Sequence, residues 1–305
     1  MSKSYILVTG GAGHVGSHLI ERLVKNPNYQ VISLDNYFNG SKNNHIDGAE
    51  YREGHTKDID KLIPEKIDVI FHLGEYARVT PSFEDVDKVL EMNVIGTARV
   101  VEYWRKSPNC KLVYAGSSTR FAIEGDGGHH QNPYAYSKAT NVDLINNYGK
   151  WYGLPYAICY FCNAFGPREK GEGKYGTLIA KFEQMYLKGQ PFTIVKPGTQ
   201  KRNFTYVGDL AQGMILVAEK GEGDGYTLGS NHKYSIIEIA EAFGGKIEYI
   251  DGYPGRAEMG EAPNKAREEL GWKTTIEVID YIKDFVAKNK KPSLLAQTLR
   301  QNILD

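Results

Sequence analysis

A cluster of glycines directly follows the first apolar run of the chain. The run Tyr5–Thr9 is predicted to be a strand, and the amphipathic stretch His14–Lys25 is predicted to be a helix. The glycines between them satisfy both G-x-G-x-x-G and G-x-x-G-x-x-G spacing: Gly10, Gly11, Gly13 and Gly16. Such a turn lets the backbone approach a pyrophosphate, whose charge the helix N-terminus stabilises. The segment therefore favours a dinucleotide-binding site.

The rest of the first half of the chain repeats this alternation of short apolar runs and helical patterns. Further strands are predicted at Val31–Asp35, Val69–Leu73, Lys111–Ala115 and Tyr156–Phe161. Further helices are predicted at Val86–Lys106 and Tyr134–Tyr152. A βαβ alternation of this kind predicts an α/β protein with a Rossmann-type, doubly wound parallel sheet.

Beyond Gly166 the pattern changes to irregular loops and three predicted helices, Thr177–Lys188, Ser235–Phe243 and Ile276–Lys288. A chain of 305 residues also lies just past the roughly 250–300 residues at which single cores stop growing. We therefore expect a smaller α/β C-terminal substrate lobe. The expected division gives residues 1–165 plus about 203–221 to the dinucleotide-binding domain, and 166–202 plus 222–305 to the substrate lobe.

Composition excludes several classes of protein. The 37 basic and 37 acidic residues cancel, which argues against a nucleic-acid binder that depends on bulk basic charge. No apolar stretch reaches the ~18 residues of a membrane span, and Tyr5–Val8 is too short for a secretory signal. Three cysteines suit a reducing compartment, so we expect a cytoplasmic protein. His129 and His130 lack further ligands at a suitable spacing, so we expect no metal site.

The second predicted strand ends in an acidic residue, Asp35, which lies 19 residues after Gly16. A carboxylate at this position can accept hydrogen bonds from an adenosine ribose. It also repels a 2′-phosphate. The sequence therefore predicts NAD rather than NADP as the cofactor.

A tyrosine and a lysine with Y-x-x-x-K spacing open a predicted helix after Pro133. Tyr134 and Lys138 lie one turn apart on the same face. A phenol is a poor base at neutral pH, but a neighbouring ammonium favours its ionised form. Tyr134 could then take a proton from a sugar hydroxyl while the carbon gives hydride to nicotinamide. Ser117 follows another predicted strand, at the sheet edge where ligands bind, and could hydrogen-bond the reacting oxygen.

These motifs, in this order, resemble the extended short-chain dehydrogenase/reductase family, and within it the NAD-dependent nucleotide-sugar epimerase/dehydratase group. The likeness extends over nearly the whole chain. Its segments are Thr9–Ser17, Asp35–Asn36, Asn39–Lys42, Asp58–Ile59, His72–Gly74, Asn93–Thr97, Ser117–Thr119, Pro133–Lys138, Asn163–Arg168, Arg202–Asp209 and Leu270–Trp272.

The resemblance implies a role for each matching residue. Tyr134 is the expected acid/base, Lys138 its electrostatic partner, and Ser117 the catalytic serine. The expected cofactor contacts are Gly10, Gly13, His14, Val15, Gly16, Asp35, Asn36, Asn39, Gly40, Ser41, Asp58, Ile59, Leu73, Gly74, Asn93, Tyr134, Lys138 and Phe161. The expected substrate contacts are Ser117, Ser118, Thr119, Asn163, Thr177, Leu178, Arg202 and Arg256.

The departures from the group narrow the expected reaction. Dehydratases of the group carry an Asp-Glu pair after the catalytic residue, and decarboxylases carry a Glu in that segment, whereas this chain has Ser118 and Thr119. We therefore expect an epimerase of a nucleotide-diphosphate sugar, acting at C4 of a UDP-hexose through a 4-keto intermediate. A reductase or dehydratase of the same family, or an inactive NAD-binding scaffold, are the alternatives.

Two further expectations concern neighbours of these motifs. Glu75 and Arg78 follow the third predicted strand, where they could reach the substrate or pair with each other at the surface. The helices Val86–Lys106 and Tyr134–Tyr152 present apolar positions that could form a four-helix seam. By resemblance, we expect a homodimer.

Overall fold

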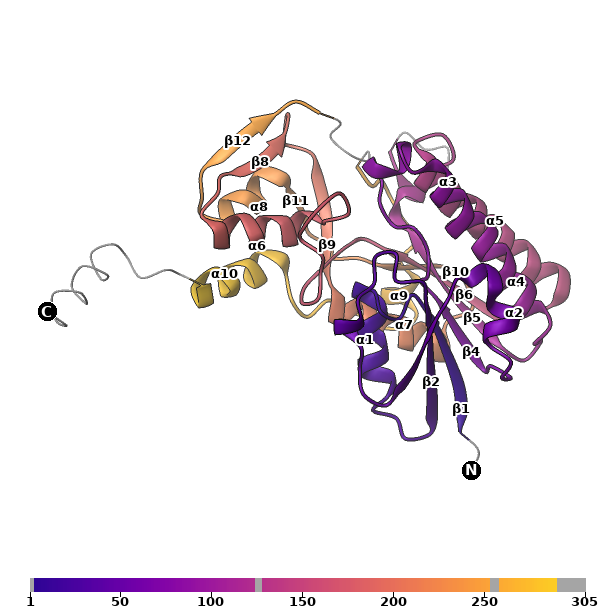
Figure 1. Cartoon of the computed structure of the whole chain (residues 1–305). Coiled ribbons are helices and arrows are strands. Elements are labelled where there is room, and N and C mark those ends of the chain that lie inside the picture. Colours follow the sequence, from indigo (N-terminus) through magenta and orange to yellow (C-terminus); the bar gives the residue numbers. More distant parts are fainter. Residues whose placement is uncertain (1–2, 124–127, 253–257, 290–305) are drawn as a thin grey trace, which may run out of the picture.

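The computed structural model describes residues 3–123, 128–252 and 258–289. A large sheet with helices on both faces forms one unit, and a smaller unit of strands and helices lies beside it (Figure 1). In spatial order the large sheet contains β10 (Gly223–Leu228), β6 (Tyr156–Phe161), β5 (Lys111–Ser117), β4 (Val69–His72), β1 (Ser4–Thr9), β2 (Tyr29–Asp35) and β3 (Ala49–Glu53). Every neighbouring pair is parallel. This confirms the Rossmann-type doubly wound fold.

Alternating side chains along the strands build a core on each face of this sheet. On β1, Leu7 points into one core, whereas Ile6 and Val8 point into the other. The helices on the Leu7 side are α2 (Ile59–Leu62), α4 (Gly96–Arg105) and α5 (Pro133–Tyr152); those on the opposite side are α1 (His14–Leu23), α7 (Val207–Lys220) and the short α9 (Lys265–Glu268) (Figure 1). Burial on both faces explains why these strands read as continuous apolar runs.

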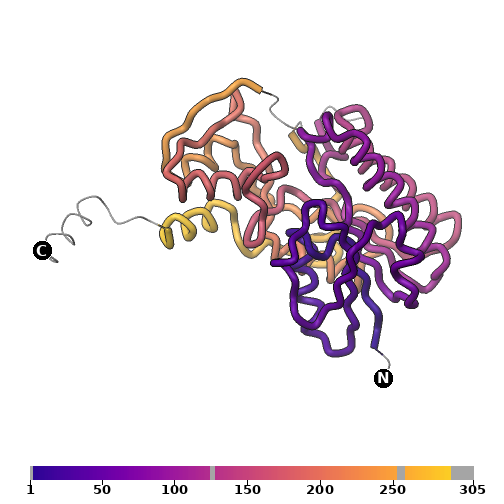
Figure 2. Tube along the Cα trace, viewed as in Figure 1, coloured from indigo at the N-terminus to yellow at the C-terminus, as the bar shows by residue number. Residues whose placement is uncertain are grey.

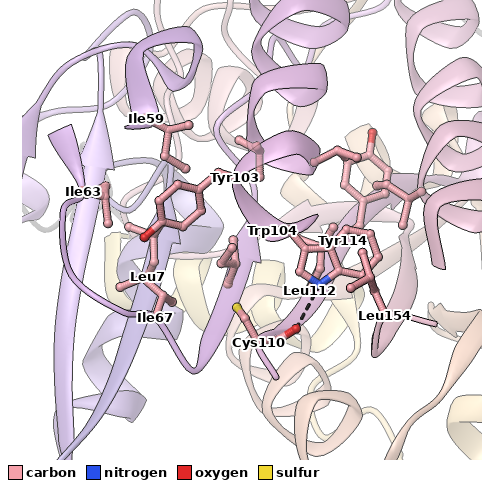
Figure 3. Packing of buried hydrophobic residues seen from close by; sticks show 14 of the residues in the cluster. Leu7, Ile59, Ile63, Ile67, Tyr103, Trp104, Cys110, Leu112, Tyr114 and Leu154 are labelled. Atoms are coloured by element: carbon pink, nitrogen blue, oxygen red, sulfur yellow. Dashed lines mark hydrogen bonds between the residues drawn. The ribbon is translucent and has the colours of Figure 1, made fainter. Parts of the chain in front are cut away.

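Figure 3 shows the core on the Leu7 side. Trp104 of α4 is fully buried there, and its indole N–H donates to the carbonyl of Cys110 at 2.9 Å. Tyr103 donates its hydroxyl to the carbonyl of Glu65 at 2.7 Å. The polar ends of these large rings therefore have partners, so their apolar surfaces are buried without an unpaired donor.

The stretch predicted as one helix from Val86 to Lys106 is divided into three. It consists of α3 (Val86–Val89), the π-helical turn η4 (Leu90–Ile95) and α4. Such π-turns are frequent near functional sites. The remaining short turns are η1 (Lys42–Asn44), η2 (Thr56–Asp58), η3 (Thr80–Phe83) and η5 (Ser118–Phe121).

The smaller unit has its own core. One small sheet has the order β11 (Lys233–Ser235), β9 (Lys201–Tyr206) and β7 (Asn163–Phe165), and a second pairs β8 (Phe192–Val195) with β12 (Ile247–Ile250). The helices are α6 (Leu178–Lys188), α8 (Ile236–Phe243) and α10 (Val278–Asn289). The aromatic rings of Phe182, Phe192 and Phe243 pack together between them.

The chain passes between the two units several times, as the trace in Figure 2 shows. Two strands depart from the expected division of the chain. The strand β10 is the edge of the large sheet, although 222–305 was expected in the second lobe. The strand β9 pairs only within the small sheet. We therefore propose that the first unit includes Gly223–Leu228 and the second includes Lys201–Tyr206.

Candidate active site

The glycine turn brings the start of α1 against the end of β1. A Cβ on Gly16 would lie 2.2 Å from the carbonyl oxygen of Gly10. Gly10 has a φ of +72° and lies so close to the loop after β4 that a Cβ there would be 2.9 Å from the Cα of Gly74. Side chains at these positions would push apart the start of α1, the end of β1 and the loop after β4, and so would prevent the close backbone approach that a pyrophosphate requires. The turn therefore fits a dinucleotide.

Asp35, at the end of β2, is fixed by backbone donors on both carboxylate oxygens. The N–H groups of Ala12 and Tyr37 donate to it at 2.9 and 2.8 Å. Desolvation raises the pKa of Asp35, while these two N–H groups act in the opposite direction. The carboxylate thus faces the glycine turn with fixed geometry, as a ribose acceptor requires.

One cavity of about 860 Å³ runs between the two units. Its walls include most of the residues predicted from the sequence. From the cofactor set they are Gly10, Gly13, His14, Val15, Gly16, Asp35, Asn36, Asn39, Gly40, Leu73, Gly74, Tyr134, Lys138 and Phe161; from the substrate set they are Ser117, Asn163, Thr177, Leu178 and Arg202. The fold therefore brings the two predicted sets together.

Six predicted residues lie off the cavity wall: Ser41, Asp58, Ile59, Asn93, Ser118 and Thr119. Arg256 lies outside the described residues. Ile59 is fully buried in the core on the Leu7 side, and Asp58 ends the turn η2 beside it. Ser41 accepts from the N–H of Asn43 and so caps η1. For these residues, contact with a ligand stays a prediction.

Asn93 instead supports the loop after β4, part of which lines the cavity, and Thr119 supports the cavity residue Ser117. Asn93, in the π-turn, accepts from the N–H of Tyr76 at 2.6 Å and donates to its carbonyl at 3.0 Å, which fixes the loop after β4. Thr119 donates its hydroxyl to the Oγ of Ser117 at 3.0 Å. This bond leaves the Ser117 hydroxyl proton available to donate to another acceptor.

The start of α5 places Tyr134 and Lys138. Asn132 caps the helix by accepting from the N–H of Ala135 at 2.9 Å, and Pro133 occupies the first turn. Tyr134 and Lys138 are 9% and 6% exposed, and both face the cavity that Ser117 also lines. The three predicted catalytic residues therefore line the same cavity.

Lys138 is held by groups from two other segments. Its ammonium pairs with the carboxylate of Glu75, donates to the carbonyl of Ala115 at 2.6 Å and contacts the hydroxyl of Tyr114 at 3.4 Å. The partner of Glu75 is thus Lys138 and not Arg78. Arg78 donates instead to the carbonyl of Tyr175 at 2.6 Å and lines the cavity.

Four cavity residues have buried polar atoms without a hydrogen-bond partner in the described parts of the chain. The atoms are Nε2 of His14, Oδ1 of Asn39, both carboxyl oxygens of Glu169 and Oε1 of Gln200. Burial lowers the pKa of His14 to about 3 and raises that of Glu169 to about 8. Sequence reasoning missed Glu169, which comes directly after the recognised segment Asn163–Arg168 and carries no motif of its own.

Within residues 3–123, 128–252 and 258–289, no cluster of three potential metal-ligating side chains occurs. His129 lies 3.4 Å from the carboxylate of Asp143. In the same ranges, no helix is long and apolar enough to cross a membrane.

Comparison with known proteins places the chain in a family. The model of the NAD dependent epimerase/dehydratase family matches residues 6–229. A protein of Methanocaldococcus jannaschii named "Putative UDP-glucose 4-epimerase" is 34% identical, covering 92% of this chain and 97% of its own length. Human dTDP-D-glucose 4,6-dehydratase is 32% identical, covering 77% of this chain and 72% of its own. The UDP-glucose 4-epimerase of Thermus thermophilus, solved with NAD, has a TM-score of 0.81 and 26% identity, covering 94% and 99% of the two chains.

The fold and site therefore define a nucleotide-sugar enzyme of the extended short-chain dehydrogenase/reductase type. The chain belongs to the NAD-dependent epimerase/dehydratase family. Membership confirms NAD as the cofactor predicted from the glycine turn and Asp35.

Proposed function

We propose that the protein is an NAD-dependent epimerase of a nucleotide-diphosphate sugar, acting at C4 of a UDP-hexose. One observation carries this proposal: Ser117, Tyr134 and Lys138 line the same cavity as the glycine turn and the second unit's Arg202. A redox-active cofactor, an acid/base pair and a cation for phosphate would therefore meet in one space. The relative from Methanocaldococcus, named as a UDP-glucose 4-epimerase, supports the same reaction.

Each residue has a defined part in the chemistry. Tyr134, as phenolate, removes the proton of the C4 hydroxyl, while Ser117 donates a hydrogen bond to the same oxygen and orients it. The ammonium of Lys138 stabilises the negative charge of the phenolate. NAD, when bound, supplies the acceptor and later the donor of the hydride. The 4-keto sugar would turn in the cavity, and Tyr134 would return the proton to the C4 oxygen.

The second unit is proposed to hold the nucleotide. The cavity that the glycine turn lines is also lined by Asn163, Thr177, Leu178 and Arg202. Arg202 offers a guanidinium on β9, which suits a phosphate oxygen. The backbone of β9 is fixed beside it, because Asn163 donates its amide to the carbonyl of Asn203 at 2.6 Å.

The dehydratase alternative has one observation in its favour. Glu169 lines the cavity with an elevated pKa of about 8, so it is largely protonated at neutral pH and could donate a proton to a leaving hydroxyl. Against it, the two residues directly after Ser117 are Ser118 and Thr119, neither of which has a carboxyl group. A released 4-keto product would favour the dehydratase over the epimerase.

The test uses a panel of UDP-, GDP-, CDP- and dTDP-linked sugars, incubated with the purified protein without added cofactor. We expect interconversion of C4 epimers with a UDP-sugar. Tyr134→Phe should lower turnover by about 10²–10⁴-fold, the usual contribution of general acid/base catalysis, and should retain NAD. Tyr136→Phe is the matched control, because Tyr136 is on the same helix but is 44% exposed. Normal turnover in Tyr134→Phe would refute the mechanism, and failure of every sugar would favour the inactive scaffold.

We also propose that the protein is a cytoplasmic homodimer. Exposed apolar side chains gather on neighbouring elements: Val86 on α3, Leu90 and Ile95 on η4, and Tyr136 on α5. An apolar surface on two adjacent helices suits a symmetric four-helix seam. Light scattering tests this, because a monomeric mass would exclude the dimer.

A further inference from the structure

Glu75 is an acidic residue buried beside the proposed base, and the proposed mechanism does not use it. Its side chain is only 1% exposed, although it follows β4 in a loop. A lone carboxylate at this depth would be costly, so its partners must compensate for the lost water. The number and kind of those partners indicate what the residue does.

Four side chains from three elements bind this carboxylate. One oxygen, Oε1, accepts from Asn141 at 2.7 Å, from Tyr114 at 3.0 Å and from Thr97 at 3.1 Å. The other oxygen, Oε2, pairs with the ammonium of Lys138. Neutral donors thus fix one oxygen and leave the second directed at the lysine.

The electrostatic potential at Tyr134 depends on the charged and titratable groups around Lys138. From β4, His72 lies within electrostatic reach, but burial lowers its pKa to about 4, so it is neutral at pH 7. From β5, Tyr114 lies under the ammonium, 4.8 Å from Nζ to the ring centroid, and burial raises its pKa well above the ordinary value. From the loop after β4, the cation of Arg78 lies within electrostatic reach of Tyr134. Glu75 is therefore the anion directly paired with Lys138.

We propose that Glu75 is a positioning residue that holds the Lys138 ammonium at the cavity wall and partly offsets its charge, and so sets the pH at which Tyr134 becomes a base. This rests on the proposed role of Tyr134. An ammonium paired with a carboxylate favours a nearby phenolate less than a free ammonium does. Removing the negative charge should therefore make Tyr134 ionise at a lower pH.

The experiment titrates Tyr134 in the NAD-loaded protein without any substrate. The ultraviolet absorbance of tyrosinate is recorded against pH for each protein and for the same protein with Tyr134→Phe, and the difference isolates Tyr134. Glu75→Gln removes the charge, and Glu75→Asp keeps it but retracts it by one methylene. Glu102→Gln is the matched control, because Glu102 likewise binds a cation and a tyrosine hydroxyl, those of Arg105 and Tyr148, on the outer part of α4.

We expect the titration midpoint of Tyr134 to fall by about 1 pH unit in Glu75→Gln, as expected for one charge removed within ~10 Å at an effective dielectric near 20. Glu75→Asp should give a smaller fall, and Glu102→Gln none. An unchanged or higher midpoint in Glu75→Gln would overturn the proposal. If that variant does not fold, a midpoint in Glu75→Asp that is not below wild type overturns it equally.

This outcome is separate from that of the proposed function. If no sugar is converted but the midpoint falls as expected, the proposed reaction fails while the role of Glu75 stands. If sugars are converted but the midpoint does not move, the reaction stands and Glu75 is only a packing residue. Where an epimerase assay is available, the acid limb of its pH profile should move in the same direction and by the same amount.

Discussion

Replacing Gly16 by alanine is expected to separate the start of α1 from the end of β1. The new Cβ would lie 2.2 Å from the carbonyl oxygen of Gly10 and 2.8 Å from the Cα of Gly11. Ordinary contact begins near 3.4 Å, so the helix must move by about 1.2 Å relative to the turn. Both obstacles are backbone atoms and cannot rotate away, so the helix itself must shift.

Overpacking of this kind costs about 1–3 kcal/mol, and the better helix propensity of alanine returns up to ~1 kcal/mol. For a chain of this length we expect the melting temperature of the NAD-free protein to fall by about 2–3 °C. The affinity for NAD should fall at least about tenfold, because a shift of this size removes the close backbone approach that the pyrophosphate requires. Calorimetry measures both quantities.

Gly149→Ala is the control that separates packing from cofactor binding. Its Cβ would also lie 2.2 Å from another atom, the Cε1 of Tyr156, but this atom belongs to a half-buried side chain that packs against the core and does not line the cavity. It should lower the melting temperature and leave the affinity for NAD unchanged. Wild-type affinity in Gly16→Ala, or an equal loss of affinity in both variants, would refute the steric reasoning.

Three further predictions concern titratable or charged groups. Asp35→Asn removes the charge that repels a 2′-phosphate, so the ratio of NADP to NAD affinity should rise about tenfold or more by titration calorimetry; an unchanged ratio would contradict this. Because the pKa of His72 is lowered to about 4, its contribution to stability is present above about pH 6.5 and is lost as the pH falls toward 4, by about 3 kcal/mol. His72→Gln should flatten that part of the melting-temperature profile, and a parallel profile would exclude it. Burial raises the pKa of Glu169 to about 8. The protonated acid therefore contributes to the stability of the fold below about pH 4.5, and this contribution is lost as the pH rises toward 8. The stability of Glu169→Gln relative to wild type should therefore be at least ~1 kcal/mol higher at pH 8 than at pH 5. The same relative stability at both pH values would contradict a buried, protonated Glu169.

The strands that the sequence predicted well are those with a continuous apolar run. The predicted strands Tyr5–Thr9 and Tyr156–Phe161 correspond to β1 and β6, because strands buried on both faces are continuously apolar. The strand β3 was missed, because it is a half-exposed edge with charged residues. The strand β10 was also missed, since its sequence begins with Gly-Asp-Gly, which is typical of a turn.

In the site, contacts between residues close in sequence could be predicted, whereas contacts between residues far apart in sequence could not. The spacing of Tyr134 and Lys138 is local, so the helix period was enough to place them on one face. The partner of Lys138 is Glu75, which lies 63 residues away along the chain. No pattern in the sequence predicts a pairing between residues so far apart. Arg78 was the expected alternative partner of Glu75 because it is close in sequence, yet the loop after β4 directs the two side chains to different groups.

The pairing of Glu75 with Lys138 also explains how this site can exist before its ligands arrive. Lys138 is only 6% exposed, so its ammonium loses most of its hydration, and a phenolate or a phosphate is not always present to compensate. The carboxylate of Glu75 supplies that compensation from within the protein, and three neutral donors in turn stabilise the carboxylate. Lys138→Met should therefore destabilise the fold, because it leaves Glu75 buried without its cation, at a cost of about 3–5 kcal/mol. Combining it with Glu75→Gln should recover a large part of that loss in thermal unfolding. If the two losses simply add, the ion pair does not stabilise the empty site, and Lys138 must depend on the bound cofactor for its place.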